Sequence, residues 1–310
     1  MKAFLRILAF LPGLLLSPPL WSQPVSPRAV ISKYQALRAA ASGQPYRLPF
    51  YIGSSEKDDT LSGDVYAEVA QPFADVAPLL ALPATWCYFI PVSLNIKACT
   101  QHRKQGVAYL TLYGGRDVYE ALASTYRLQY RFQPEVVRDD YLRLRLTAAN
   151  GPLGTSNYLI VLDMLPYESG TLIHIHTSYH TGILSRIAAR LYLATLGRDK
   201  VGFSITGYDK DGKPIFVQGM KGLIERNALR YFLALQAYLD TRAVPAAKRY
   251  DAMLKMWFGF TERYPKQLHE MGWAEYLHGK QREHENQLQL QKEIDGGQLP
   301  ATPLPEHENQ

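Results

Sequence analysis

The chain has 310 residues, of which 47% are hydrophobic, and its 34 Lys and Arg against 28 Asp and Glu give a net charge of +6. This length and composition allow one large hydrophobic core with appendages. No run rich in Lys and Arg and interleaved with aromatic residues occurs, so we expect no nucleic-acid partner.

The first 22 residues have the pattern of a secretory signal peptide. Lys2 and Arg6 supply a positively charged start, an apolar run follows over residues 7–16, and a Pro-rich stretch of small residues leads to Ser22. The apolar run is shorter than the ~20 residues that a membrane span requires. We therefore expect cleavage near Ser22, a periplasmic location and a mature net charge of +4. Such a charge is compatible with a transient contact with an anionic membrane surface.

Residues 23–60 are expected to contain a leading helix, over 29–41, followed by a linker. The main domain then covers residues 61–241. Its first segment, 61–70, alternates apolar and polar side chains, which is the period of a half-buried strand. Two short helical pieces follow, and prolines separate and end them.

The two cysteines of the chain, Cys87 and Cys99, lie close together in the sequence at the end of this helical region. In an oxidising compartment an even, close pair is typical of one disulfide, and we expect that bond here. The alternative is two buried thiols. The spacing differs from the C-x-x-C pattern of redox proteins, so the pair is expected to be structural.

The next part of the chain predicts an antiparallel meander. Residues 126–132 and 141–147 each alternate apolar with polar side chains, and the polar set is rich in arginine. A strict period of two places the two sets on opposite faces of a strand. We therefore expect a hairpin whose arginine-rich outer face meets water, with further strands over 107–113, 158–165 and 172–181. The inner face is expected to carry Tyr126, Leu128, Tyr130, Leu142 and Leu144.

Beyond the meander the sequence returns to helices. A helical period over 183–196 precedes a short hairpin at 201–218, and residues 220–239 form the most regular amphipathic pattern of the chain. Residues 242–295 are expected to form an accessory helical segment, and the polar tail 296–310 is expected to be disordered. The apolar stripe of the long helix consists of Ile224, Ala228, Tyr231, Leu235 and Tyr238.

Few residues point to chemistry. His174 and His176 are two apart and would share one strand face, an arrangement that can hold zinc, but two ligands do not make a site. We expect a polar strand face there and no metal. The chain contains no nucleophile elbow, zinc-protease motif or phosphate-binding loop, so no catalytic residue and no cofactor is predicted. At the start of the long helix, Lys221 and Glu225 are spaced for a surface ion pair.

One strand, two short helices, a long antiparallel meander and a closing amphipathic helix form an order that resembles the helix-grip fold of the START and polyketide-cyclase-like superfamily. The resemblance covers residues 61–241 and concerns architecture. Short segments, including Trp86-Cys87 and Glu225-Arg226-Asn227, also look similar to a group of exported bacterial proteins. That likeness brings no assigned activity.

The resemblance implies an α+β fold in which a curved antiparallel sheet grips a long C-terminal helix, with extra helices after it and a mostly apolar cavity between sheet and helix. On this basis we expect a soluble periplasmic protein that binds or carries a lipid or another hydrophobic molecule. Two alternatives stay open: an enzyme that uses the same scaffold on a hydrophobic substrate, and an envelope interaction protein with no ligand cavity. The ligand-binding residues are expected to be Tyr126, Leu128, Tyr130, Leu142, Leu144, Arg226, Tyr231, Leu235 and Tyr238.

Overall fold

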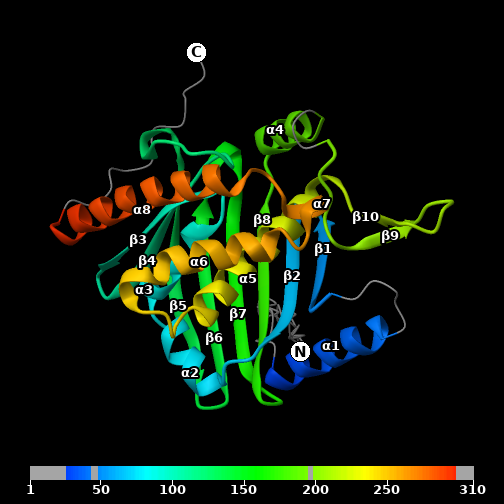
Figure 1. Ribbon diagram of the computed structural model, residues 1–310, viewed down its shortest axis with the longest axis horizontal. Helices are drawn as coiled ribbons and strands as arrows, with labels where there is room; N and C mark the ends of the chain where they lie inside the picture. The colour runs from blue at the N-terminus through cyan, green and yellow to red at the C-terminus, as the bar shows by residue number, and fades with distance from the viewer. Residues whose placement is uncertain (1–25, 43–47, 195–197, 298–310) are drawn as a thin grey trace, which may run out of the picture.

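An eight-stranded antiparallel sheet forms the frame of the protein (Figure 1). The computed structural model describes residues 26–42, 48–194 and 198–297. The predicted signal peptide lies outside these residues, as does the predicted tail beyond Gly297. The strands are β1 (Phe50–Lys57), β2 (Thr60–Val69), β3 (Ile96–Lys104), β4 (Val107–Gly114), β5 (Tyr126–Arg138), β6 (Tyr141–Asn150), β7 (Ser156–Tyr167) and β8 (Gly170–His180).

The strand order is β1-β2-β8-β7-β6-β5-β4-β3, so the meander that starts at β3 returns to pair with β2. Two short helices, α2 (Phe73–Leu80) and α3 (Pro83–Phe89), connect β2 to the meander, and α5 (Gly219–Asp240) follows it. This order and the α+β class confirm the helix-grip architecture expected from the sequence. Among the described residues no single helix is long and apolar enough to cross a membrane, and only 73–80 together with 83–92, bent by 96°, passes that test as a pair.

Strand β1 was not expected from the sequence, which indicated a linker before residue 61. It pairs with β2 along its whole length and forms one edge of the sheet. Its sequence contains Gly53, Ser54 and Ser55 in the middle and ends in charged residues, so it lacks the alternation that marks a half-buried strand. The charged residues at the end of such an edge strand protect a sheet against pairing with other chains.

Helix α5 lies across the inner face of the sheet, mainly over β1 and β2 (Figure 1). Gly63 of β2 allows this close approach, because a Cβ there would lie 3.3 Å from Cγ1 of Ile224. Ala228 and Leu235 on the same helix are 2% exposed and belong to the main hydrophobic core. The helix therefore packs tightly on this part of the sheet.

The disulfide between Cys87 and Cys99 is present, as predicted, with the two Cα atoms 4.7 Å apart. It ties α3 to β3. In the chain-entropy account, closing such a short loop stabilises the fold by about 3 kcal/mol. Trp86, next to Cys87, is buried and donates from Nε1 to the carbonyl oxygen of Leu80 at 2.8 Å, which fixes α3 against α2.

Helix α8 (Trp273–Asp295) covers the exposed edge of β3 with glutamine side chains. Gln287 Oε1 accepts a hydrogen bond from the backbone N–H of Cys99 at 2.8 Å. Gln291 accepts from the N–H of Gln101 at 2.9 Å and donates to its carbonyl oxygen at 3.0 Å. These amides satisfy main-chain groups that a neighbouring strand would otherwise satisfy.

The remaining helices lie on both sides of the sheet. The inner side carries α6 (Ala246–Thr261), which packs on α5, and the short α7 (Pro265–Leu268). On the outer face, α1 (Pro27–Ala41) buries Val30 and Tyr34 in a small second core. Helix α4 and a two-stranded hairpin complete the fold, with bounds α4 (Ile183–Ala194), β9 (Ile205–Tyr208) and β10 (Pro214–Phe216).

Candidate functional site

The residues predicted to line a cavity do not share one environment. Leu142 and Leu144 are 0% exposed, Leu235 is 2% exposed, and all three belong to the main core. Their side chains therefore fill the middle of the space between sheet and helix. Tyr130, 4% exposed, lies on the same inner face.

Tyr130 is one of four tyrosines that lie together where β7 begins and β8 ends. The ring of Tyr158 stacks on that of Tyr179, with centroids 5.0 Å apart, and meets Tyr130 edge-on at 6.2 Å. Tyr231 of α5 is close enough to Tyr130 and Tyr179 to act on their ionisation. Tyr130 is buried, whereas the other three are half-buried. We call this group, Tyr130, Tyr158, Tyr179 and Tyr231, the tyrosine recess.

The hydroxyls of the tyrosine recess are neutral hydrogen-bonding groups. Burial raises the pKa of all four above the usual tyrosine value, so none ionises near neutral pH. Tyr158 donates to Oγ1 of Thr155 at 2.7 Å, and Nδ2 of Asn95 donates to the hydroxyl of Tyr231 at 2.9 Å. Within the described residues, the hydroxyls of Tyr130 and Tyr179 have no hydrogen-bond partner. The recess thus combines aromatic faces with hydroxyls that are free to bind a polar group.

Apolar side chains are exposed beside the tyrosine recess. The turn η3 (Pro152–Gly154), which precedes Thr155, exposes 45% of Leu153. Helix α4 contacts this turn and exposes 72% of Ile183 and 49% of Ile187. These residues form an apolar rim on the side of the recess nearest η3.

Four more of the predicted residues occupy separate places. Leu128 is half-buried against the core, and Tyr126, 52% exposed, begins β5 and pairs with Gly114 at the end of β4. Tyr238 packs on Phe89, with ring centroids 5.9 Å apart. Arg226, 1% exposed, forms an ion pair with Glu270 and donates from Nε to the carbonyl oxygen of Gln267 at 2.8 Å.

Glu225, expected in a surface ion pair with Lys221, is instead 0% exposed. Its carboxylate accepts hydrogen bonds from Oγ of Ser54 and Oγ of Ser204, both at 2.7 Å. It also accepts from the backbone N–H of Phe203 at 2.7 Å. The residue therefore fastens β1 and the segment before β9 to the start of α5, and the expectation of a surface pair was wrong because its partners are distant in sequence.

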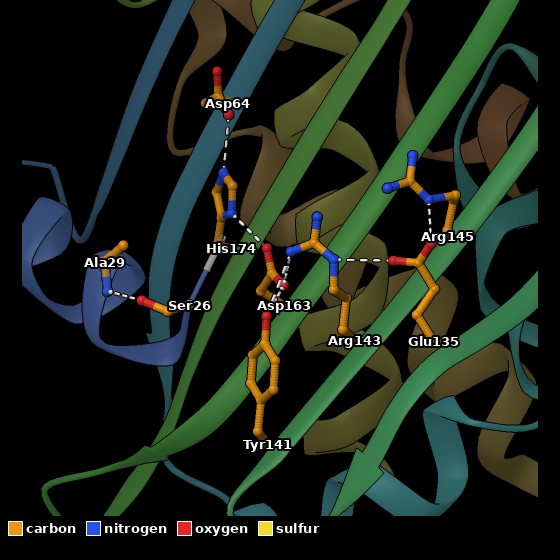
Figure 2. A network of polar contacts seen from close by, with 9 residues as sticks. All are labelled: Ser26, Ala29, Asp64, Glu135, Tyr141, Arg143, Arg145, Asp163 and His174. Atoms are coloured by element: carbon orange, nitrogen blue, oxygen red, sulfur yellow. Dashed lines mark hydrogen bonds and ion pairs between the residues drawn. The ribbon is translucent and has the colours of Figure 1, made fainter. Parts of the chain in front are cut away.

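The outer face of the sheet carries a buried polar network that the sequence analysis missed (Figure 2). His174 lies between two carboxylates, with Nε2 2.9 Å from Oδ1 of Asp64 and Nδ1 3.1 Å from Oδ2 of Asp163. Asp163 also accepts from Nη1 of Arg143 at 2.6 Å and from the hydroxyl of Tyr141 at 2.5 Å. The network joins side chains of four strands.

The expectation that the arginines of the hairpin meet water is wrong for Arg143. This residue is 5% exposed, because strand register places it directly opposite Asp163, which in turn lies opposite His174. The alternation of 141–147 indicated the correct face, but only the register of distant strands shows which charges meet. The sequence did contain one signal, because Asp163 stands at an outward-facing position of the predicted strand 158–165.

The charges of this network support one another. Burial opposes the ionisation of Asp64 and Asp163, but the hydrogen bonds and charges of their neighbours, first among them the hydrogen bond from His174, together outweigh it and hold the pKa of both carboxyls below the usual value. Burial likewise opposes protonation of His174, and the hydrogen bonds to the two carboxylates outweigh it and raise its pKa. His176 also lies 3.0 Å from Asp64. Among the described residues no group of three or more His, Cys, Asp and Glu side chains is arranged to hold a metal ion.

Two hollows lie outside the grip, by which we mean the sheet together with α5, and both border α8. One, of about 240 Å³, lies between α8 and the start of the meander, and its wall includes Lys97 and Lys280. The other, of about 530 Å³, lies between α3, α6 and α8. Neither is lined by a residue that the sequence analysis predicted as ligand-binding.

No family model matches the chain, and no curated protein does. Among solved structures it is similar to the Zhui aromatase/cyclase of a Streptomyces species, at 11% identity and a TM-score of 0.31, over 66% of this chain and 94% of that one. A truncated norcoclaurine synthase from Thalictrum flavum shares 15% identity at a TM-score of 0.30, over 46% and 91%. A protein from Mycobacterium smegmatis shares 15% identity at a TM-score of 0.33, over 60% and 96%. The helix-grip architecture rests on the strand order and on the position of α5.

Proposed function

We propose that the protein is an exported binding protein that holds an amphipathic hydrophobic molecule at the tyrosine recess. The observation that carries this proposal is the set of four clustered tyrosines, of which Tyr130 is buried and the other three are half-buried. Two of their hydroxyls, those of Tyr130 and Tyr179, have no partner within the described residues. A ligand with an apolar body and one polar group would stack on the rings and bind these hydroxyls.

The surroundings of the recess support the same ligand chemistry. The apolar rim at Leu153, Ile183 and Ile187 is suited to the passage of a hydrophobic molecule from solution or from a membrane surface. The middle of the grip is filled by core side chains such as Leu144. The ligand is therefore proposed to occupy the end of the grip rather than its full length.

The periplasmic location is part of the proposal. The signal-peptide pattern of residues 1–22 supports it, and the Cys87–Cys99 disulfide agrees with an oxidising compartment. N-terminal sequencing of the protein recovered from the periplasmic fraction tests it. A mature chain that starts close after Ser22 is expected, and an uncleaved chain retained in the cytoplasm would contradict it.

Ligand binding is tested with the mature protein in two ways. Native mass spectrometry of protein purified from its own envelope should show a bound mass that denaturation releases. A fluorescent fatty acid should bind saturably, and Tyr179→Trp, which adds bulk in the recess, should weaken that binding. Tyr208→Phe, on the exposed β9–β10 hairpin, is the control and should bind as the wild type does.

An envelope interaction protein is the second candidate. The observation in its favour is that Leu142, Leu144 and Leu235 are fully packed and that both hollows described above lie at α8 rather than in the grip. The fatty-acid measurement separates the two candidates. If the wild type binds no probe and carries no mass, the interaction protein stands and the binding protein is excluded.

A further inference from the structure

The larger hollow, of about 530 Å³, lies on the accessory helices and away from the tyrosine recess. Its walls come from α3, from the first two turns of α6 and from the middle of α8. We call it the α6–α8 hollow. Ala246 and Ala247 at the start of α6 line it, and their small side chains leave the space open. Aromatic, acidic and amide side chains complete the wall: Tyr88, Tyr250, Asp251, Gln281, His284 and Glu285.

Two tyrosine rings form adjacent walls of this hollow. The rings of Tyr88 and Tyr250 lie at 72° to one another, with centroids 6.2 Å apart. His284 stacks on Tyr250 at 3.7 Å and 14°, which holds the ring of Tyr250 in place. Within the described residues neither tyrosine hydroxyl forms a hydrogen bond, and the cation–π contacts of the chain use other rings. Two fixed rings at a steep angle can therefore receive a cation from outside.

The charge of the hollow is negative. Asp251 and Glu285 are exposed at its border. Burial lowers the pKa of His284, although these two carboxylates oppose the shift, so the imidazole is neutral at pH 7. The positive charge of Arg249 acts on Tyr88 from outside the lining, and its Nε donates to the carbonyl oxygen of Val244 at 3.1 Å. The charged side chains of the lining are thus these two carboxylates, and Asp251 accepts a hydrogen bond from Nε2 of Gln281 at 3.3 Å.

We propose that the α6–α8 hollow binds a small organic cation of the quaternary or methylated ammonium class. Such a cation is attracted to the faces of Tyr88 and Tyr250 by their ring quadrupoles, and its methyl groups lose little hydration on contact. Asp251 and Glu285 attract the positive charge at the border. The site uses different residues and a different ligand chemistry from the tyrosine recess, so it does not depend on the proposed function.

The test uses the mature full-length chain and tetramethylammonium as the probe, measured by isothermal titration calorimetry or by chemical shifts of the tyrosine rings. Saturable binding is expected for tetramethylammonium and for choline. The neutral isostere of choline, 3,3-dimethylbutan-1-ol, should bind about tenfold more weakly than choline, since it lacks the charge that the rings and carboxylates recognise. Tyr250→Phe keeps the ring and should retain binding. Tyr250→Leu and Asp251→Asn should each weaken it.

Asp251 is exposed, so Asp251→Asn is expected to fold even if Tyr250→Leu does not, and melting curves establish this for each variant. Glu293→Gln changes another exposed carboxylate of α8, outside the hollow, and serves as the matched control. Equal binding of the cation and its neutral isostere would overturn the proposal. So would a loss of binding in the control that matches the loss in Asp251→Asn.

The ammonium group could belong to a free metabolite or to a lipid headgroup, and two further arms separate these sources. Free choline and vesicles of phosphatidylcholine are titrated in parallel, with phosphatidylglycerol vesicles for comparison. Binding of choline alone indicates a soluble ligand. Binding to phosphatidylcholine vesicles that choline competes away indicates a headgroup. If tetramethylammonium, choline and phosphatidylcholine all fail to bind, the proposal is wrong.

Discussion

Arg143 and Asp163 face each other across β6 and β7, with Nη1 2.6 Å from Oδ1, on the side of the sheet that turns away from α5. Both side chains are almost fully buried, at 6% and 1% exposure. A charge pair removed from water in this way is held only while each member keeps its partner. The outer face of the sheet, expected to be a solvated surface, is therefore a region on which stability depends.

Asp163→Asn is expected to destabilise the protein by about 3–5 kcal/mol, because it leaves buried charge on Arg143 and His174 without its shared partner. Urea unfolding followed by circular dichroism measures the loss. Asp140→Asn breaks the exposed pair between Arg138 and Asp140 and should change stability by less than about 1 kcal/mol. Equal effects of the two substitutions would show that the buried network contributes no more than a surface pair.

The pH dependence of stability should have two limits set by the same network. The pKa of His174 is raised, so its contribution is complete below its unfolded value of about 6.5 and is lost as pH rises through the folded pKa. The pKa values of Asp64 and Asp163 are lowered, so their contribution is present above about 3.9 and is lost as pH falls through the folded values. Unfolding free energies measured across this range should form a maximum between the limits.

His174→Gln is expected to remove the decline on the alkaline side of that maximum. NMR titration of the imidazole gives an independent reading, and His174 should titrate above 6.5. A His174 resonance that titrates at or below that value contradicts the account of the two carboxylates.

Thiol titration of the denatured, unreduced protein should find no free cysteine. The reason is the Cys87–Cys99 bond, which closes a short loop in both the folded and the unfolded chain. Reduction should cost about 3 kcal/mol and lower the melting temperature. Two reactive thiols in the unreduced sample would show that the bond does not form in the cell.

Ala228→Phe should cost about 1–3 kcal/mol, because Ala228 is 2% exposed on the face of α5 that packs into the core. Thermal unfolding measures the effect. Lys221→Phe, an exposed position near the start of the same helix, is the control and should have little effect. A variant at Ala228 that is as stable as the wild type would mean that a cavity extends beneath the middle of α5.

Patterns along the chain were sufficient to predict the principal elements of the fold. The alternation at residues 141–147, the apolar stripe from Ile224 to Tyr238 and the close cysteine pair are local signals, and the structure contains the strand, the helix and the bond that they indicate. Strand β1 was not predicted because its residues do not alternate between apolar and polar side chains. Strand β5 also extends beyond the predicted segment 126–132, because it continues through Pro134 to Arg138 with a register shift after the proline.

The arrangement of polar residues could not be predicted in the same way. The partners of Glu225 lie on β1 and before β9, and Arg226 meets Glu270 beyond α6. Such pairs depend on how distant segments meet, which no local period encodes. The clustering of Tyr130 with Tyr158 and Tyr179 likewise depends on the register of three strands and on their common curvature around α5.

The glutamine side chains of α8 determine which fragments of the chain can be produced without exposing an edge of the sheet. The sheet and α5 together span residues 50–240, yet a fragment ending there would leave the backbone groups of Cys99 and Gln101 on β3 without their side-chain partners. Two such fragments would meet edge to edge and extend one sheet into the next. A proteolytic cut before Trp273 would therefore leave one sheet edge through which two copies can pair, and the last helix serves as the terminator of the sheet.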